Sequence, residues 1–261
     1  MEITEEQFQL ARAAGFAFAL VAALALQRWL PHERQRGSWR VNSSLWIVNG
    51  VVIGAVCGAC ACAAARWAEA RGLGVLNAGP LPLWVAALTT VAVLDVVSYG
   101  WHRANHVVGF LWRFHRVHHS DRNFTVTTGV RFHPGELLLS LPIRLAAVVL
   151  LGAPLYGVLA FELAFTVANL IEHGDIDYPR RLDAALGRLF VTPSLHRCHH
   201  THQRPELDSN FGTIFSVWDR LLGTYRHSAP GEAIETGAPG IEGNLRLFET
   251  LRLPFAPGIP V

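Results

Sequence analysis

Long apolar runs are the feature that most limits how this chain can fold. Residues 10–30 and 45–65 are apolar almost throughout, and residues 82–99 form a third run. About 20 consecutive apolar residues match the thickness of a bilayer, and in lipid such a segment satisfies its backbone hydrogen bonds by forming a helix. We therefore expect an all-α integral membrane protein with three apolar spans within residues 10–100.

Two further apolar runs, residues 137–151 and 155–171, follow later in the chain. Gly152-Ala153-Pro154 lies between them and indicates a turn. Each run is short for a full span, so we expect a helical hairpin over residues 137–172 that either re-enters or crosses the membrane. The whole chain, residues 1–261, is then a single membrane domain with about four transmembrane or hairpin helices.

Charge predicts the orientation of these helices. All 22 basic residues are arginines, and the formal net charge of +2 gives no case for a nucleic-acid partner. Positive residues favour the cytoplasmic side, and arginines follow the first run at once: Arg28, Arg34, Arg36 and Arg40. The acidic N-terminus is then outside, and the parity of the runs places residues 101–136 and 173–226 in the cytoplasm. Arg66 and Arg71, on the expected outer side, conflict with this topology.

Histidines gather in short motifs on the expected cytoplasmic side. Two motifs share one spacing, His115-Arg-Val-His118-His119 and His196-Arg-Cys-His199-His200, and the pair His102-x-x-x-His106 precedes them. Helical residues three or four apart lie on one face, and neutral imidazole binds zinc, iron, copper or nickel. Eight converging histidines exceed what one ion needs, so we expect a dimetal site in a cytoplasmic helical cap. Solvated histidines, or core histidines bonded to backbone, are the alternative, but they would not explain a repeated motif.

The later segments complete the predicted organisation. Residues 101–136 carry the first histidine motifs, and the cap over residues 173–226 carries the last one. We expect a helix over residues 182–190 and a helix start at Thr192-Pro193-Ser194. Residues 227–261 form a peripheral tail, in which residues 245–253 could be a short helix that lies on the bilayer interface or packs against the cap.

Polar residues inside the apolar runs need a structural reason. Asp95 is costly in lipid unless it faces the bundle, so it could bond a ligand histidine or another helix. Cys57, Cys60 and Cys62 lie in an apolar run, which favours small-residue helix packing over a disulfide or a zinc knuckle. Cys198 lies a helical step away from the neighbouring histidines, and we do not expect it to bind metal.

The order of these motifs resembles that of a known family. The pair, the two His-x-x-His-His motifs and the stretch Trp218–Tyr225 are similar to the fatty acid hydroxylase/sterol desaturase superfamily, over residues 90–226. The resemblance also includes Asp95, Tyr99, His133-Pro134-Gly135-Glu136 and Asn210-Phe211-Gly212. It implies a membrane oxygenase with a non-haem di-iron centre at the cytoplasmic face, O2 as co-substrate and a lipid as substrate.

Carried over residue by residue, the resemblance implies nine metal-binding histidines: His102, His106, His115, His118, His119, His173, His196, His199 and His200. His133 matches a histidine of the sterol-oxidase branch and is a further candidate. The hydroxylase branch often has a histidine where this chain has Asp177, which is either a carboxylate ligand or leaves that coordination site empty. Asp95 and Asn169 are candidates for a ligand or for support of one. His32, His202 and His227 have no motif support.

The resemblance also implies the cofactors and partners. It implies two iron ions, O2 and an external electron donor, a separate cytochrome, ferredoxin or reductase. The activity would be hydroxylation or desaturation of a sterol or fatty acyl chain, in lipid biosynthesis. The arginine-rich, lysine-free composition suggests a bacterial inner membrane. Three alternatives stay open: a metal transporter would need ligands along a crossing path, a zinc hydrolase would work without O2, and haem ligation would use a histidine pair.

Overall fold

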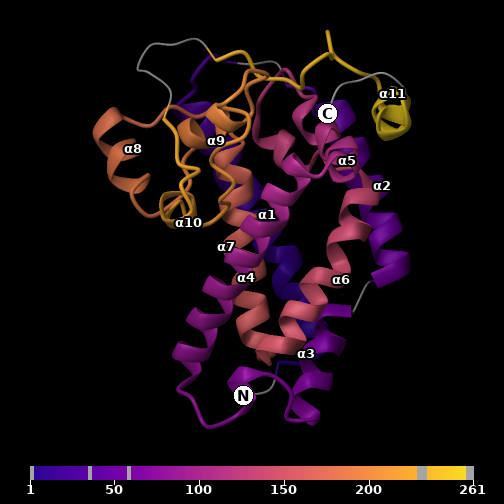
Figure 1. Ribbon diagram of the computed structural model, residues 1–261, viewed down its shortest axis with the longest axis vertical. Helices are drawn as coiled ribbons and strands as arrows, with labels where there is room; N and C mark the ends of the chain where they lie inside the picture. The colour runs from indigo at the N-terminus through magenta and orange to yellow at the C-terminus, as the bar shows by residue number, and fades with distance from the viewer. Residues whose placement is uncertain (1–2, 35–36, 58–59, 228–233, 257–261) are drawn as a thin grey trace.

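The computed structural model describes residues 3–34, 37–57, 60–227 and 234–256. Within these ranges the chain has no β-strand, and extended residues pair only in isolated bridges such as Pro31–Ile176. Figure 1 shows a bundle of long helices below a cap of short helices and loops. The predicted all-α fold is therefore confirmed.

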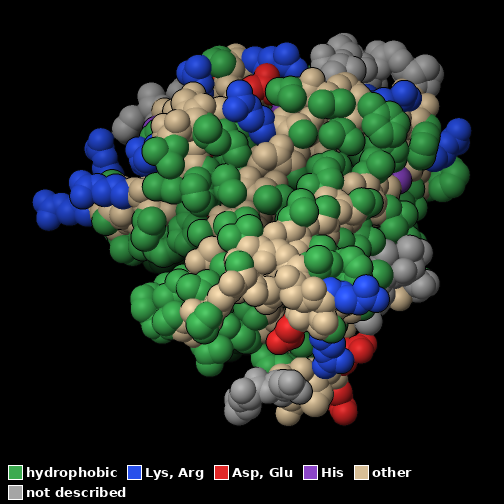
Figure 2. Space-filling view, turned by 60° about the horizontal axis from the view of Figure 1, so that its bottom comes forward, with side chains coloured by type: hydrophobic (Ala, Val, Ile, Leu, Met, Phe, Trp, Pro, Cys, Tyr) green, Lys and Arg blue, Asp and Glu red, His purple; other side chains and the backbone are tan. Residues whose placement is uncertain are grey.

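Four helices in the described part of the chain are long and apolar enough to cross a membrane: α1 (Glu5–Trp29), α4 (Leu83–Val107), α6 (Pro134–Leu151) and α7 (Leu155–Glu172). α7 lies centrally, because it packs against both α1 and α4. Val158 and Phe161 of α7 share a buried cluster with Phe8 of α1 and Leu94 of α4. Figure 2 shows hydrophobic side chains over much of the bundle's flank, which is the surface that lipid would cover.

The region of the second predicted span contains α2 (Trp39–Cys57) and α3 (Cys60–Ala70), and residues 58–59 between them lie outside the described residues. α2 begins before the apolar run because neighbouring loops provide hydrogen-bond partners for its polar side chains. The side-chain Nδ2 atom of Asn42 donates to Asp121 Oδ2 at 2.8 Å, and Nδ2 of Asn49 donates to the Phe132 carbonyl at 2.9 Å. A hydropathy pattern cannot foresee partners so distant in sequence.

Small residues of α3 pack as the composition predicts. Cys62 and Ala65 are buried in the same cluster as Val148 of α6 and Leu155 of α7, and α3 lies against α6. Small side chains let helix backbones approach closely. The side chain of Cys57 lies outside the described residues, so the expectation for it stays a prediction.

The α6–α7 hairpin turns where the sequence predicts. Gly152 adopts a left-handed conformation with φ of 67°, and its N–H donates to the Val148 and Val149 carbonyls. Glycine reaches this conformation without steric cost, and Pro154 then precedes the first residue of α7. Each helix has 18 residues, or about 27 Å at 1.5 Å per residue. The hairpin is therefore long enough to cross a bilayer rather than only to re-enter it.

The cap is built from short helices: α5 (Gly109–His119), α8 (Arg180–Leu186), α9 (Pro193–His199), α10 (Val217–Leu221) and α11 (Leu247–Arg252), with the 3-10 helices η2 (Val126–Val130) and η3 (Leu253–Phe255). A third 3-10 helix, η1 (Val75–Asn77), lies at the other end of the bundle. α8 ends before the predicted residue 190, because the next residues pair with another segment. Val191 N donates to the Ile214 carbonyl, and Ser216 N donates to the Leu189 carbonyl.

The segment over residues 245–253 packs against the cap. Leu253 is buried together with Leu45 of α2 and Val117 of α5. The Arg113 Nε atom donates to the Pro254 carbonyl at 2.7 Å, and Arg116 donates to the Leu253 carbonyl at 2.5 Å. Of the two alternatives for this segment, the structure therefore shows packing on the helix that carries the second histidine motif.

Candidate metal centre

The metal-candidate histidines begin at the cap end of α4. The helix does not stop near Tyr99 but continues to Val107, so it includes both His102 and His106. These two residues are one turn apart on the same face. α5 follows directly, and its own i, i+4 pair is His115 and His119.

A group of five histidines forms where α4, α5 and α9 meet. One ring nitrogen from each member lies within 4.8 Å of the others: His102, His106, His115, His119 and His199. The first four are the two helical pairs, and α9 supplies the fifth. Three helices from distant parts of the sequence therefore direct imidazoles to one point.

A second group of four histidines lies beside the first. Its ring nitrogens also lie within 4.8 Å of one another: His118, His173, His196 and His200. His173 follows the last residue of α7, and α9 provides the i, i+4 pair His196 and His200. Within the described residues, the two groups together contain all nine predicted histidines.

The two His-x-x-His-His motifs serve the groups in opposite ways. The α5 motif gives its first and last histidines to the five-histidine group and its middle one, His118, to the four-histidine group. The α9 motif does the reverse: only its middle histidine, His199, belongs to the five-histidine group. The groups also touch, because the rings of His119 and His200 stack with centroids 4.2 Å apart. The geometry therefore provides two adjacent sites rather than one large one.

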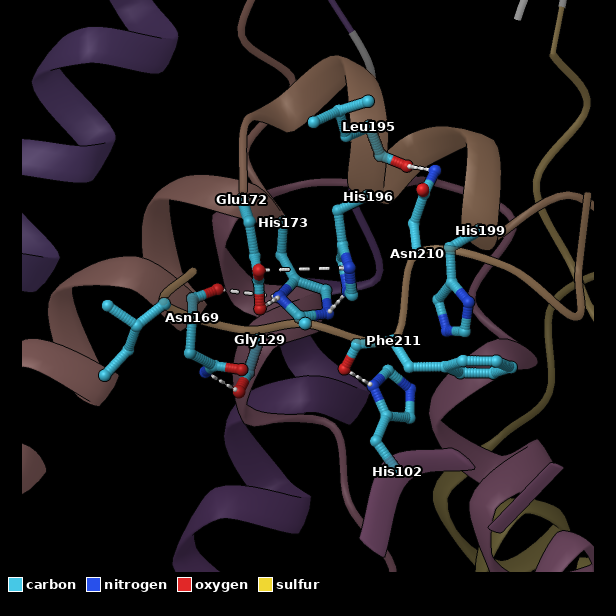
Figure 3. A network of polar contacts seen from close by, with 12 residues as sticks. His102, Gly129, Asn169, Glu172, His173, Leu195, His196, His199, Asn210 and Phe211 are labelled. Carbon is cyan, nitrogen blue, oxygen red and sulfur yellow. Dashed lines mark hydrogen bonds and ion pairs between the residues drawn. The ribbon is translucent and has the colours of Figure 1, made fainter. Parts of the chain in front are cut away.

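Hydrogen bonds at Nδ1 fix the orientation of the rings. His102 donates to the Phe211 carbonyl at 2.9 Å, and His199 donates to the Ser209 carbonyl at 2.6 Å. His173 donates in the same way to the Asn169 carbonyl at 2.6 Å (Figure 3). A histidine that donates from one ring nitrogen presents the other as a lone pair, which is the usual arrangement of a metal ligand.

The Nε2 atoms in both groups fit metal ions. In the five-histidine group Nε2 is buried without a hydrogen-bond partner on every member. In the four-histidine group His173 Nε2 lies 2.9 Å from Nε2 of both His118 and His196. Buried polar atoms are rarely left unpaired, and an ion bound among them would pair them all.

Burial also keeps these imidazoles neutral. It lowers the pKa of His173 and of His199 to about 3, with neighbouring imidazoles adding to the effect. Burial and the adjacent rings likewise lower the pKa of His118, His119, His196 and His200 well below the ordinary value. Neutral imidazole is the form that binds a metal, so the protein favours the ligand form at neutral pH.

A sequence-family comparison agrees with this geometry. The family model described as fatty acid hydroxylase matches residues 87–224, which is more than half of the chain. This chain belongs to the fatty acid hydroxylase family. The matched residues begin within α4 and end after α10, so they contain both histidine groups and the α6–α7 hairpin.

Several curated proteins similar to this chain have names that describe lipid-modifying enzymes. The ornithine lipid hydroxylase of Rhizobium tropici is 33% identical over 161 residues, which cover 60% of this chain and 47% of that protein. The alkylglycerol monooxygenase of Homo sapiens is 27% identical over 173 residues, covering 66% and 36%. The lathosterol oxidase of Mus musculus is 29% identical over 165 residues, covering 61% and 51%. The chain thus spans about a third to a half of these relatives, and no solved structure matches it significantly.

Two buried glutamates accompany the histidines in this family member. Glu136 belongs to a motif of the resemblance, but the sequence predicted a role at the site for neither. Glu136 of α6 accepts from His115 Nδ1 at 2.8 Å and from Asn105 Nδ2 at 3.2 Å. Glu172 of α7 lies 3.7 Å from His173 Nδ1 and 3.9 Å from His196 Nδ1 (Figure 3). Each histidine group therefore has a buried glutamate beside it, and the five-histidine group also has Asp208, whose Oδ1 lies 3.5 Å from His106 Nδ1. The available signal was a carboxylate at the end of an apolar run, because Glu136 directly precedes residues 137–151 and Glu172 directly follows residues 155–171.

The other candidate residues lie outside both histidine groups. His133 caps α6 by accepting from Gly135 N, and its Nε2 donates to the Leu251 carbonyl. Asp177 is exposed and lies 3.9 Å from His32. Asn169 supports His173 through its carbonyl, while its side chain donates to the Gly129 carbonyl at 2.6 Å. Cys198 is buried but belongs to neither group.

Asp95 supports the cap rather than a ligand histidine. Its carboxylate accepts hydrogen bonds from Ile214 N and Phe215 N, both at 3.1 Å, and from Trp218 Nε1 at 2.7 Å. Of the two alternatives considered from the sequence, the bond to a ligand histidine is not found among the described residues, whereas the bond from Trp218 of α10 is a hydrogen bond between helices. The segment before α10 adds the two backbone donors. Asp219 of α10 accepts from Phe211 N at 2.7 Å, and the Phe211 carbonyl in turn holds His102.

A cavity of about 130 Å³ adjoins the two groups on the membrane side. His102, His118 and His173 line its upper end, and its walls come from α4, α6 and α7. Most of the lining is apolar, including Val97, Leu137 and Phe165, and Glu136 and Glu172 contribute polar atoms close to the histidines. Such a cavity could hold an alkyl chain next to bound metal.

Proposed function

We propose that this protein is an O2-dependent di-iron oxidoreductase that hydroxylates or desaturates a membrane lipid, a sterol or a fatty acyl chain. The observation that carries the proposal is the pair of adjacent histidine groups above a largely apolar cavity. Family membership and the names of the relatives support a lipid substrate. Imidazole ligands suit iron and also zinc, so the choice of iron rests on the family resemblance.

The residues of this chain would perform three tasks in such a reaction. The nine histidines would hold two iron ions, and bound iron supplies the reduction of O2 that oxidation of a C–H bond requires. Nδ1 hydrogen bonds keep the rings of His102, His173 and His199 in a fixed orientation, and the burial of the other group members helps to exclude water. The apolar walls from α4, α6 and α7 would place a lipid carbon next to the metals.

The orientation and the electron donor are part of the proposal. Arginines gather around the cap end of the molecule, as the blue side chains at the upper rim of Figure 2 show, and positive residues favour the cytoplasmic face. We therefore place the histidine groups at the cytoplasmic side of a bacterial inner membrane. A separate cytochrome, ferredoxin or reductase would supply electrons, and an acidic surface on that protein would complement the arginines.

Metal transport and metal-dependent oxidation make different demands on the ligands. A transporter needs polar ligands along a path through the bundle, whereas both groups in the described chain lie together at the cap end of α4 and α7. The geometry therefore favours a reaction centre. Hydrolysis by zinc would use the same imidazoles, and only metal content and the need for O2 separate it from the proposal.

The His118→Ala variant tests the centre directly. His118 belongs to the four-histidine group, so the variant should lose metal and lipid oxidation, while His202→Ala should keep both. His202 is a matched control, because it lies in the cap but outside both groups and bonds only the Glu235 carbonyl in the described chain. Metal analysis of purified protein, together with lipid mass spectrometry of cells with and without each variant, gives the readout.

The expected product difference is one added oxygen atom or two lost hydrogen atoms in a cell lipid, present only with O2. Iron should be found at two ions per chain. Purified wild-type protein that contains zinc and turns over without O2 would contradict the proposal. Full lipid oxidation by the His118→Ala variant would contradict it as well.

A further inference from the structure

Three hollows meet at one side chain in the membrane part of the bundle. The cavity beside the metal centre shares Val97, Ser98 and Arg144 with a second cavity of about 130 Å³ deeper in the bundle. It also shares Arg144 and Phe165 with a wider groove of about 850 Å³ between α1, α2, α6 and α7. The groove on the flank of the bundle and the cavity beside the histidines therefore adjoin each other at Arg144.

Arg144 lies well inside an apolar helix. It is ten residues after Pro134 at the metal end of α6, or about 15 Å along the axis, and about 10 Å before the end at Leu151. The residue is exposed, which here means that it is open to the groove and its surroundings. A charge at this depth in a bilayer is costly and needs a partner.

The protein itself does not neutralise this charge. Among the described residues, Arg144 forms no ion pair, and its guanidinium lies 5.9 Å and 6.0 Å from the rings of Phe161 and Phe165. Glu162 is the carboxylate that lines the same groove, and it is paired with Arg12. Two arginines and one glutamate line the groove, which leaves one positive charge without a counter-charge.

Polar side chains stand at both ends of the cavity beside the histidines. Glu136 and Glu172 line the metal end, and each has one buried carboxylate oxygen without a hydrogen-bond partner. Glu136 precedes Arg144 by eight residues on α6, so the two ends are about 12 Å apart. An anionic group would be attracted at Arg144, which no carboxylate of the described residues pairs, whereas an apolar chain fits the largely apolar cavity that leads toward the histidines.

We propose that the groove binds a lipid whose head group carries one negative charge, with Arg144 as its binding partner and one acyl chain directed toward the metal centre. The guanidinium fork suits a carboxylate or a phosphodiester equally. The apolar groove residues Phe16, Leu20 and Trp46 provide contacts for the rest of the lipid. This inference deepens the proposed function, because it names the substrate class of the same site and fixes which end of the lipid is oxidised.

Native mass spectrometry of the metal-loaded protein in an uncharged detergent tests this site. Palmitate and phosphatidylglycerol are the anionic probes, and methyl palmitate and diacylglycerol are their uncharged counterparts. The wild type should bind at least one anionic probe about tenfold more tightly than its counterpart, as expected for a charge-assisted bidentate contact. The probe that shows the preference distinguishes a carboxylate from a phosphodiester head group.

Three variants define the outcome. Arg144→Gln should abolish the preference while keeping the metal content of the wild type, and Arg144→Lys should keep part of it, because the charge remains. Arg180→Gln, at an exposed arginine of α8 outside the groove, should bind like the wild type. Equal binding of charged and uncharged probes by the wild type would overturn the inference. An unchanged preference in Arg144→Gln would overturn it as well, and so would the same preference in Arg144→Lys and Arg144→Gln.

Binding needs neither O2 nor a reductant, so the test is independent of the oxidation reaction. Wild-type protein that oxidises lipid but shows no charge preference would contradict only the Arg144 site. A retained preference without any O2-dependent product would instead contradict the proposed function.

Discussion

Glu136 is a side chain that orients one histidine of the candidate metal centre without belonging to either histidine group. Its Oε1 atom accepts from His115 Nδ1 at 2.8 Å, and a carboxylate in this position raises the basicity of the imidazole and fixes its orientation. The residue is separated from His115 by an entire loop, which is why the histidine motif alone could not reveal it. Asp95 is a comparable case, since its three hydrogen-bond donors all come from residues 214–218.

The Glu136→Gln variant should weaken metal binding by the five-histidine group. The amide keeps the size of the side chain and can still accept from His115, but it loses the negative charge, so we expect about 10- to 100-fold lower affinity. Competition with a chelator, followed by metal analysis, measures this. Glu242→Gln, at an exposed position in the tail, is the control, and equal metal retention by the two variants would refute the role of Glu136.

Among the elements, the α6–α7 hairpin depends on the conformation of one glycine. Gly152 has φ of 67°, and a Cβ atom added there would lie 2.6 Å from the Leu73 carbonyl oxygen. The Gly152→Ala variant should therefore lose about 1–2 kcal/mol of unfolding free energy from the left-handed backbone alone, and more from the clash. Gly100 of α4 has open space around its Cβ position, so Gly100→Ala is the matched control.

Thermal unfolding in detergent provides the measurement for these two glycines. Gly100→Ala should match or exceed the wild-type midpoint, because alanine favours a helix interior over glycine by up to about 1 kcal/mol. Gly152→Ala should unfold at a lower temperature than both. If the two variants unfolded at the same temperature, the turn geometry would not limit the stability of the hairpin.

α5 and α9 are the elements whose packing forms the two histidine groups. The spacing of each motif determines which of its histidines share a helical face, but the partition into groups of five and four arises only where the two helices meet. α5 also needs an anchor, and the carbonyls of Leu253 and Pro254 bind its Arg116 and Arg113. This contact joins the C-terminal segment to the helix that carries His115, His118 and His119.

For the whole molecule, burial of the cap histidines predicts acid sensitivity of the metal-free protein. Burial lowers the pKa of His173 and His199 from 6.5 to about 3 in the folded state. Below pH 6.5 the unfolded chain therefore binds more protons than the folded chain, so the unfolding free energy falls as the pH decreases toward 3. Each such histidine contributes up to about 1.4 kcal/mol per pH unit.

The melting temperature of metal-stripped protein, measured between about pH 7.5 and about pH 5, checks this prediction within the range where histidine titrates. It should fall steadily below about pH 6.5. Metal-loaded protein should release its ions over a similar range, because protons compete for the same nitrogens. A melting temperature that did not change on acidification would show that these histidines do not reach the folded state in neutral form.

The sequence by itself determined the helical character of the chain, the turn at Gly152 and which histidines are candidates for metal binding. Local rules suffice there, since apolar length, turn residues and helical spacing act over a few neighbouring residues. Only the tertiary structure decided how nine histidines divide into two groups, how Glu136 and Glu172 come to lie beside them, and how Arg144 is left without a counter-charge in a groove. Those features depend on side chains that are far apart in sequence and meet only when α4, α5, α6, α7 and α9 pack together.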